Sequence, residues 1–137
     1  MPTPTTVTPK PYMMGASSLV LNGKEYGQCV SSAKITPTVP MSVFQGIGGA
    51  ARPVAGVPTY ELELNFAQDF VTSGALSLYL NSSLAVDVSF ALTPQAGGTV
   101  LTGTVMLLPV GAGDDFGKVA GSTVKLPLVG QPTYAAA

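Results

Sequence analysis

The sequence predicts a mainly β protein, with about six strands packed as a sandwich or closed into a barrel and one short α-helix at the flank. Three observations support this fold class. Gly and Pro account for 16 and 12 of the 137 residues, which provides many turns. Apolar residues alternate with polar ones in several segments, which is the period of half-buried strands. Helical spacing occurs in a single short segment, and the chain length suits one domain.

The chain is expected to begin with an extended arm at residues 1–17, followed by one domain at 18–134 and a short tail at 135–137. Four prolines lie within the first eleven residues, and no apolar period accompanies them. The domain should open with a hairpin around Asn22-Gly23, a dipeptide that readily adopts the positive φ angles of a tight turn. A further strand is expected at residues 29–39, with its prolines at an edge.

Residues 44–58 contain four glycines and two prolines and are expected to be a long loop with a function of its own. The clearest strand of the chain follows at residues 60–66. Its aromatic and leucine side chains alternate with polar residues that include Glu61 and Glu63. The alternation predicts an apolar face turned inward and an acidic face turned outward.

One helix is expected after Asp69 and Ser73, whose side-chain oxygens can bond the free N–H groups of a first turn. Its apolar stripe would be Leu76, Tyr79 and Leu80. Such a short helix is marginal in water alone, so packing on the strands must hold it.

Strand alternation resumes at residues 86–92, and a glycine turn leads to an answering strand at 100–108. Residues 111–117 are expected to be a loop, and 124–128 a last strand. The run 88–113 carries no charge and is long enough to cross a membrane. Its prolines, glycines and threonines favour paired strands instead.

The composition argues against an enzyme. The chain has no His and no Trp, and Cys29 is its single cysteine, which excludes an internal disulfide, a Cys/His zinc site and catalysis by imidazole. Cys29 is expected to be a small apolar side chain within a strand. No catalytic residue, cofactor or metal is expected.

Three motifs suggest chemistry only weakly. The glycines at 46–49 lack the Lys-Ser/Thr of a phosphate loop, and Asp114-Asp115 lacks further metal ligands nearby. Glu61 and Glu63 occupy like environments, whereas a glycosidase pair needs different ones. With six basic and seven acidic residues, the chain also lacks the basic surface of a protein that grips DNA.

The second half of the chain resembles a known family. Residues 59–70, the short helix, the strand around Gly103-Thr104-Val105 and the ending Leu126-Pro127-Leu128-Val129-Gly130-Gln131-Pro132-Thr133 are similar to the major tail tube proteins of long-tailed bacteriophages, particularly of actinobacterial hosts. The resemblance covers about residues 59–134. Many relatives carry Trp where this chain has Phe70, which keeps an aromatic side chain there.

The resemblance implies a phage tail-tube-like fold and a structural role. Members of the family form six-membered rings that stack into a hollow tube, through which the genome leaves the capsid. The implied partners are other copies of the chain and the tape measure, terminator and tail tip proteins. DNA would pass without specific binding, and no membrane is involved. The protein would be assembled in the host cytoplasm and reside in the tail of the virion.

The resemblance also implies roles for particular residues. The N-terminal arm and the segment 44–58 would reach into the adjacent ring, and their candidate contact residues are Tyr12, Met13, Phe44, Arg52 and Val54. A conduit for DNA should not bind phosphate, so acidic residues would suit its wall. The candidates for the lumen are Glu61, Glu63 and Asp87, which could equally face solvent or a neighbouring subunit.

Two other classes of function stay open at this point. A capsid decoration or adhesin-like β-domain would also be rich in strands and turns, but would remain a monomer or trimer. A small hydrolase or a carbohydrate-binding module would need convergent polar groups and aromatic platforms, and the sequence offers isolated acids and no Trp.

Overall fold

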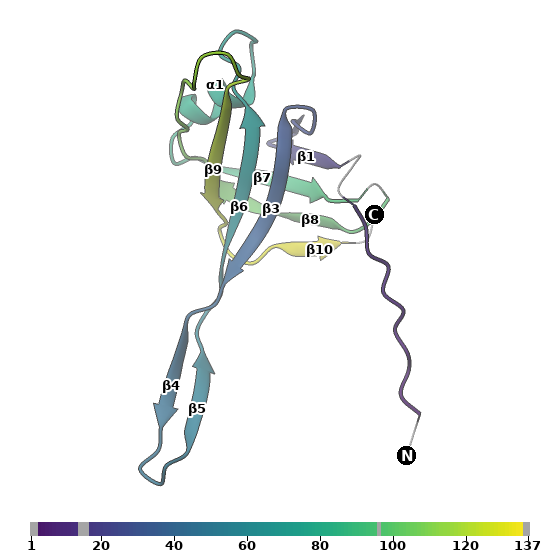
Figure 1. The fold of residues 1–137 in the computed structure, drawn as a ribbon, viewed down its shortest axis with the longest axis vertical. Helices are drawn as coiled ribbons and strands as arrows, with labels where there is room; N and C mark the ends of the chain where they lie inside the picture. The colour runs from purple at the N-terminus through teal and green to yellow at the C-terminus, as the bar shows by residue number, and fades with distance from the viewer. Residues whose placement is uncertain (1–2, 14–16, 96, 136–137) are drawn as a thin grey trace.

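The computed structural model describes residues 3–13, 17–95 and 97–135. In this part of the chain there are ten strands and one helix, which confirms the mainly β prediction (Figure 1). The elements in chain order are β1 (Ser18–Leu21), β2 (Lys24–Glu25), β3 (Val30–Thr38), β4 (Met41–Gln45), β5 (Ala51–Ala55), β6 (Thr59–Ala67), α1 (Leu76–Ser82), β7 (Asp87–Thr93), β8 (Val100–Met106), β9 (Gly121–Pro127) and β10 (Thr133–Ala135).

Two antiparallel sheets form the body of the molecule. Sheet A has the strand order β10-β8-β7-β1-β2, and sheet B has the order β3-β6-β9. Figure 1 shows the strands of sheet A running across those of sheet B, so the two layers cross rather than align. Along one side the layers are joined, because Leu128 forms a bridge to Val105 of β8.

The core lies between the two sheets and consists of the apolar residues that alternate along the strands. Leu62, Leu64 and Phe66 of β6 are at most 2% exposed. The other buried strand residues of this cluster are Leu19, Leu21, Val88, Phe90, Leu92, Val105, Val124 and Leu126. The alternation predicted at 60–66 is confirmed. In the segment 86–92 it holds from Val88 onward, whereas Val86 precedes β7 and is 47% exposed.

The two predicted hairpins of the body are present. Asn22 and Gly23 have φ angles of 50° and 81°, and two positive values are what the tightest hairpin turn requires. β7 and β8 pair through six residues each, so the uncharged run is folded as strands. Within the described residues, no helix has the length and apolar character needed to span a membrane.

Helix α1 covers one end of the sandwich. Leu76 and Leu80 are buried in the core, and the ring of Tyr79 stacks on Tyr26 with centroids 6.3 Å apart. The predicted apolar stripe is therefore confirmed. The packing explains how a helix of seven residues persists, because its own hydrogen bonds would not hold it in water.

The predicted helix caps are wrong. The N-cap residue is Ala75, and its side chain makes no capping hydrogen bond. Asp69 lies earlier and accepts hydrogen bonds from the backbone N–H groups of Val71 and Thr72. Its carboxylate stabilises the turn that leads to the helix, because Asp readily bonds backbone groups two and three residues ahead.

The segment 44–58 differs from the expected loop, since most of it belongs to the hairpin of β4 and β5. Three of its four glycines lie in the turn, where the Gly46 N–H donates to the Ala50 carbonyl at 2.7 Å. The fourth, Gly56, follows β5, and its N–H donates to the Pro40 carbonyl at 2.7 Å. Pro53 lies opposite Val43. Gly46 and Ala50 form a hydrogen-bonded pair, and every second pair along the ladder is hydrogen-bonded. The Val43–Pro53 pair falls between two such pairs, so Pro53 needs no N–H donor there.

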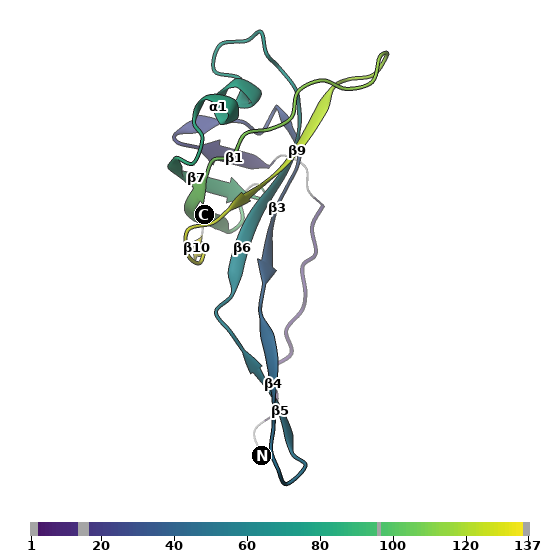
Figure 2. The ribbon, with the colours of Figure 1, turned by 90° about the vertical axis from the view of Figure 1, so that its left-hand side faces the viewer.

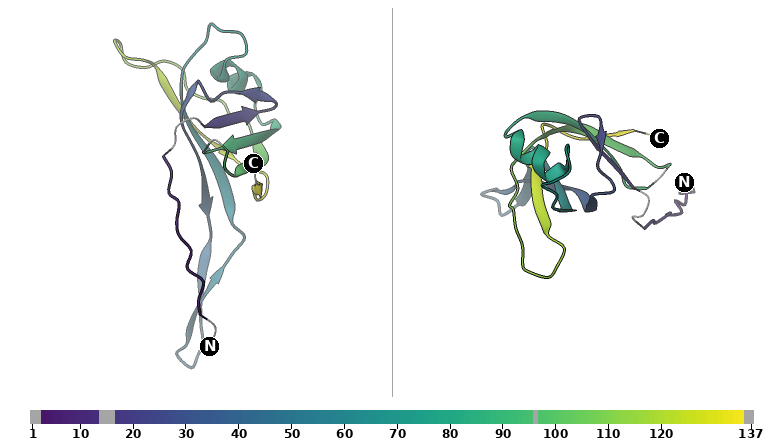
Figure 3. Two further views of the ribbon diagram at one scale, coloured as in Figure 1. Left: turned by 90° about the vertical axis from the view of Figure 1, so that its right-hand side faces the viewer. Right: turned by 90° about the horizontal axis from the view of Figure 1, so that it is seen from above.

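The hairpin of β4 and β5 projects from the body and has no second layer. β4 continues the direction of β3, and β5 leads into β6, so the four strands form one long ribbon (Figure 2). The N-terminal arm projects toward the same end of the molecule (Figure 3). These two segments are the only ones that leave the sandwich in this direction within the described residues.

The two ends of the described chain differ in structure. Residues 3–13 have no helix or strand and are exposed, whereas 1–2 and 14–16 of the expected arm lie outside the described residues. β10 extends to Ala135 and pairs with β8, so the expected tail begins within a strand. Residues 136–137 lie outside the described residues.

Cys29 does not lie within a strand. It occupies the turn before β3 and is exposed. Its N–H donates to the Tyr26 carbonyl at 3.0 Å, which closes the turn that links the two sheets. The expectation of a small apolar side chain within a strand is therefore wrong, because the strand begins one residue later.

We expect Leu62→Ala to destabilise the domain by about 2–5 kcal/mol, because Leu62 is fully buried between the sheets. Urea unfolding followed by circular dichroism measures this change. Glu61→Ala on the neighbouring, exposed position is the matched control and should change stability by less than about 0.5 kcal/mol. Equal losses for the two variants would contradict the assigned strand register.

Candidate assembly interface

The molecule has two distinct ends along the strands of sheet B. The hairpin of β4 and β5 emerges where Thr38 pairs with Thr59. The loop 111–120 leads into β9 at the other end, where Ala67 pairs with Gly121. Figures 1 and 2 show the hairpin at the bottom and the helix at the top of the molecule.

One face of the hairpin combines aromatic, cationic and aliphatic side chains. Phe44 lies directly opposite Arg52, and Val54 is two residues further along the same strand. Phe44 is 66% exposed and Val54 is 48% exposed. We call this surface the Phe44–Arg52–Val54 face. The structure thus brings together three of the five residues that the resemblance proposed for contacts between rings.

The opposite face of the hairpin is also apolar and exposed. Met41 and Val43 are 60% and 64% exposed, and Pro53 and Ala55 lie across from them. A two-stranded ribbon with apolar residues on both faces is unstable alone in water. Both faces therefore have the character of a surface that is covered in an assembly.

The two candidate residues of the arm occupy different environments. Met13 is 91% exposed. Tyr12 is 50% exposed and lies beside a cavity of about 270 Å³ between the arm and the two sheets. The cavity is also lined by Ile35 and Leu101, so the end of the arm lies against the body while the rest extends away from it.

The outer face of sheet B is polar and carries balanced charges. Lys34, Glu63 and Lys125 lie side by side on β3, β6 and β9. The Lys34 ammonium is 3.8 Å from the Glu63 carboxylate. Because the lysine side chain is 62% exposed, this ion pair adds little stability, and its main effect is to offset charge. Glu61 lies in the next row.

Asp87 does not share a surface with the two glutamates. Val88, Phe90 and Leu92 point into the core, so Asp87 at the start of β7 points outward from sheet A. Glu61 and Glu63 point outward from sheet B, on the other side of the sandwich. One wall built from a single face of the domain could hold the glutamates or Asp87, but not all three.

Sequence reasoning missed the two lysines that flank Glu63. Alternation along each strand predicts which residues face outward, but it does not predict which residues of different strands become neighbours. That information lies in the register, which pairs Lys34 with Glu63 and Glu63 with Lys125. The net charge of the face could not be predicted without it.

Sheet B ends in two strands with an open edge. β3 and β9 each pair with β6 on one side, and within the described residues neither has a full strand on the other. Such edges readily pair with another chain. β9 is partly covered, since Leu128 at its end bridges to β8.

Sheet A has edges at β2 and β10, and the carboxylate of Glu25 protects the first of them. This group accepts hydrogen bonds from the N–H groups of Leu19 and Gly27 and from the Ser18 hydroxyl. Partial burial alone would raise the pKa of Glu25, but these three hydrogen bonds outweigh it and hold the pKa below its usual value. The carboxylate therefore occupies the edge that a further strand would need.

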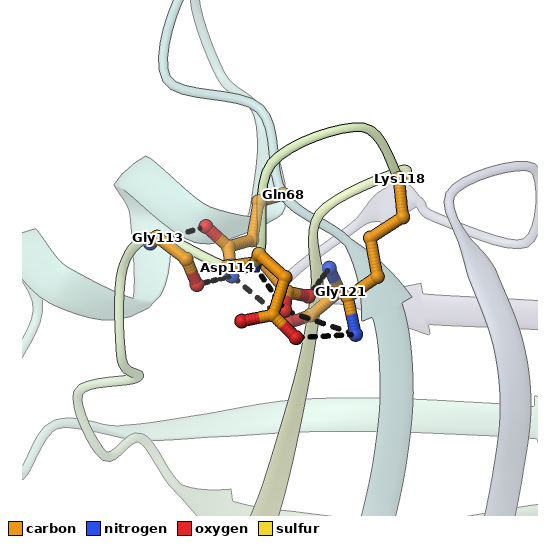
Figure 4. Close-up of polar contacts among 6 residues, drawn as sticks. Gln68, Gly113, Asp114, Lys118 and Gly121 are labelled. Carbon is orange, nitrogen blue, oxygen red and sulfur yellow. Dashed lines mark hydrogen bonds and ion pairs between the residues drawn. The ribbon is translucent and has the colours of Figure 1, made fainter.

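The loop 111–120 is held by a network of polar contacts (Figure 4). The Gln68 amide donates to the carbonyls of Gly113 and Gly121 at 3.1 and 2.8 Å and accepts from the Gly113 N–H at 2.9 Å. Asp114 accepts from the Gly121 N–H at 3.2 Å and pairs with Lys118 at 3.0 Å. The loop has a defined shape although it contains no strand or helix.

The pKa of Asp114 is lowered mainly by the backbone N–H of Asp115, and further by the Gly121 N–H and Lys118. The carboxylate therefore stays ionised at neutral pH, in agreement with the loop's ion pair. The tip is open to solvent, since the Asp115 side chain and Phe116 are fully or almost fully exposed. Among the residues described, no cluster of His, Cys, Asp and Glu could hold a metal ion.

The fold of the chain is similar to that of proteins from contractile injection systems. The sheath/tube terminator of the extracellular contractile injection system PVC in the extended state matches with a TM-score of 0.61 and 12% identity, over 95% of this chain and 100% of that chain. The tube-terminating cap of the anti-feeding prophage (AFP) matches with a TM-score of 0.64 and 11% identity, over 97% and 96%.

A chain of the PVC sheath–tube complex in the extended state matches with a TM-score of 0.58 and 13% identity, over 92% of this chain and 93% of that chain. No protein-family model matches the sequence, and no curated protein shows significant sequence similarity to it. The chain therefore has a phage-tail-like tube fold, and at this identity the likeness concerns the fold alone.

We expect Asp114→Asn to loosen the loop 111–120, because it removes the charge that pairs with Lys118 and accepts from the Gly121 N–H. Hydrogen exchange at the Gly121 amide should become faster at pH 7. Asp115→Asn is the matched control and should have little effect, because its carboxylate lies 3.9 Å from Lys118 and is 91% exposed.

The same loop should respond to acid. The pKa of Asp114 is lower in the folded chain than its ordinary value of 3.8, so its contribution is present above that value. The protection of the Gly121 amide should be lost only as the pH falls below 3.8 through the folded-state pKa. An unchanged protection in Asp114→Asn would contradict the role assigned to this carboxylate.

Proposed function

We propose that the protein is the structural subunit of a phage tail tube, of the type found in long-tailed phages. Its copies would form six-membered rings that stack into a hollow tube, whose lumen conducts the genome into the host. The observation that carries the proposal is the projecting β4–β5 hairpin, with both faces apolar, on a domain with a tail-tube-like fold.

The open edges of sheet B support the formation of a ring. β3 of one subunit could pair with β9 of the next, which would continue the sheet around the ring. Such a contact joins two different surfaces, and it closes into a ring when the rotation between subunits divides a full turn. Because Glu25 blocks the β2 edge of sheet A, sheet B would supply the continuous layer.

The outer face of sheet B supports a wall that DNA can pass. Its outward residues are mainly polar, and its two lysines are matched in number by Glu61 and Glu63, so the face as a whole would offer phosphate no net positive charge. We therefore assign Glu61 and Glu63 to the lumen. Asp87 would then lie on the outside of the tube or at a contact with another protein.

The two segments that project from the body support stacking of rings. The hairpin and the arm leave the body at the same end, and both carry exposed apolar side chains. In a stack they would reach into the adjacent ring through Phe44, Arg52, Val54, Tyr12 and Met13. Burial there would offset the loss of chain freedom in the arm.

The proposal places the protein in the virion tail after assembly in the host cytoplasm. Its partners would be other copies of the chain, a tape measure protein, a terminator and a tail tip. DNA would pass through without specific binding. We propose no enzymatic activity, which agrees with the lack of His in the sequence.

A second candidate function is that of a protein that ends the tube. Two of the similar structures are a tube terminator and a tube-terminating cap, which favours this alternative. A capsid decoration or adhesin-like domain is a more distant alternative. The size of the assembly distinguishes the three functions. A tube subunit polymerises into tubes, a terminator forms a single ring, and a decoration domain remains a monomer or trimer.

We expect negative-stain electron microscopy of the purified protein to show rings with a central hole at low concentration and tubes at high concentration. Single rings at every concentration would favour the terminator. Monomers or trimers, also after addition of a tail tip complex that initiates growth, would contradict both ring-based functions.

We expect Glu63→Lys to leave tubes intact and to lower the infectivity per phage particle by about tenfold or more, because three lysines in a row would hold DNA phosphates. Phage assembled with the variant subunit, compared by DNA content and plaque count, provide the measurement. Asp87→Lys adds the same charge on the other side of the sandwich and is the matched control. A loss for Asp87→Lys alone would assign the lumen to sheet A.

A further inference from the structure

The charges of the chain differ between the two ends of the molecule. The described parts of the arm and the hairpin segment 41–58 contain Lys10 and Arg52 and no acidic residue. The opposite end, made of residues 24–28, 68–75 and 111–120, contains four acidic residues and two lysines. One end is therefore positive and the other negative, although the whole chain is almost neutral.

Most carboxylates at the negative end are already occupied. Glu25 accepts three hydrogen bonds at the edge of sheet A. Asp69 accepts two from the turn before α1. Asp114 bonds the Gly121 N–H and pairs with Lys118 at 3.0 Å. These three side chains serve the fold of their own subunit.

Asp115 is the exception among these acids. Its side chain is 91% exposed, and its only ion pair within the described residues is a long one of 3.9 Å to Lys118. Its carboxylate can therefore accept a second cation without giving up a structural contact. Phe116 follows directly and is fully exposed. The tip of the loop presents a carboxylate beside an aromatic ring.

The Phe44–Arg52–Val54 face of the hairpin has the complementary chemistry. It presents a guanidinium with an aromatic ring directly across from it and an aliphatic side chain beside it. No acidic residue of the hairpin segment pairs with Arg52. A carboxylate and an aromatic ring on a partner would match this face in both charge and polarity.

We propose that the Phe44–Arg52–Val54 face binds the tip of the loop 111–120 of a second copy of this chain in the adjacent ring, with Arg52 paired with Asp115. Phe44 packs against Phe116 in the same contact. This inference rests on the proposed function, because it names the surface that receives the hairpin in a stack of rings. The hairpin and the loop lie at opposite ends of the β3–β6 ribbon, so a repeat along the ribbon brings them together.

The experiment exchanges the two charges. Arg52→Asp and Asp115→Arg each place like charges together at the contact, and the double variant restores an opposite pair. The critical concentration for tube growth is measured by sedimentation at low and high salt. Lys10→Asp, at the same end but off the hairpin, is the control for a change in net charge. Far-ultraviolet circular dichroism verifies that each variant is folded.

The proposal expects each single variant to raise the critical concentration by at least about tenfold, which corresponds to a coupling of about 1.4 kcal/mol. The double variant should have a critical concentration close to that of the wild-type protein. High salt should reduce the differences in critical concentration between the variants and the wild type, because it screens the charges. Lys10→Asp should have a smaller effect than Arg52→Asp.

Two results would overturn the contact and leave the function standing. If the wild-type protein forms tubes and Arg52→Asp has the same critical concentration for growth, the arginine does not face an acidic residue. If both single variants fail to form tubes and the double variant fails as well, Arg52 and Asp115 are not partners. If the wild-type protein forms neither rings nor tubes, the proposed function fails first, and this contact fails with it.

Discussion

The antiparallel pairing of β3 with β6 determines the position of every other feature in the molecule. Seven consecutive residue pairs, from Ser32–Asn65 to Thr38–Thr59, share one register along these two strands. The inner face supplies Leu62 and Leu64 to the core, and the outer face carries Glu61 and Glu63. Because the strands extend beyond sheet A, they lead directly into the β4–β5 hairpin, which forms a separate two-stranded sheet with its register shifted by one residue. A shift of one residue between β3 and β6 would exchange the core face with the polar face.

Sequence patterns predicted the parts of the fold that have two different faces. Alternation identified β6 and most of β7, since water on one side and the core on the other leave a period of two. Composition and turn residues indicated β1, β3 and β8. The β4–β5 hairpin escaped because apolar residues occupy both of its faces, and its glycines and Pro53 suggested a loop. The helix stripe was predicted from Leu76 and Leu80, but its start was not, because Ala75 makes no capping bond.

The candidate interface was predictable only in outline. Composition predicts a functional role for the segment 44–58, and the resemblance supplies its candidate contact residues. Strand register and the packing of the two sheets determine which side chains share a face. The local sequence does not determine either of them. The local sequence therefore suggests that Asp87 and Glu63 share a surface, although they lie on different sheets. It does not reveal that Lys125 is the neighbour of Glu63. Phe116 offered a weak signal, as an isolated aromatic residue in a loop of Gly and Asp.

The continuous ribbon of β3, β4, β5 and β6 also determines how the molecule would carry force. A pull on the tip of the hairpin along its length draws β3 and β6 in the same direction, so the load passes in shear to the ladder between β6 and β9. All bonds of that ladder share the load at once, whereas a pull across the strands would open them one after another. The hairpin is thus anchored in shear, the mechanically stronger direction, and tension applied at its tip is transmitted directly into sheet B.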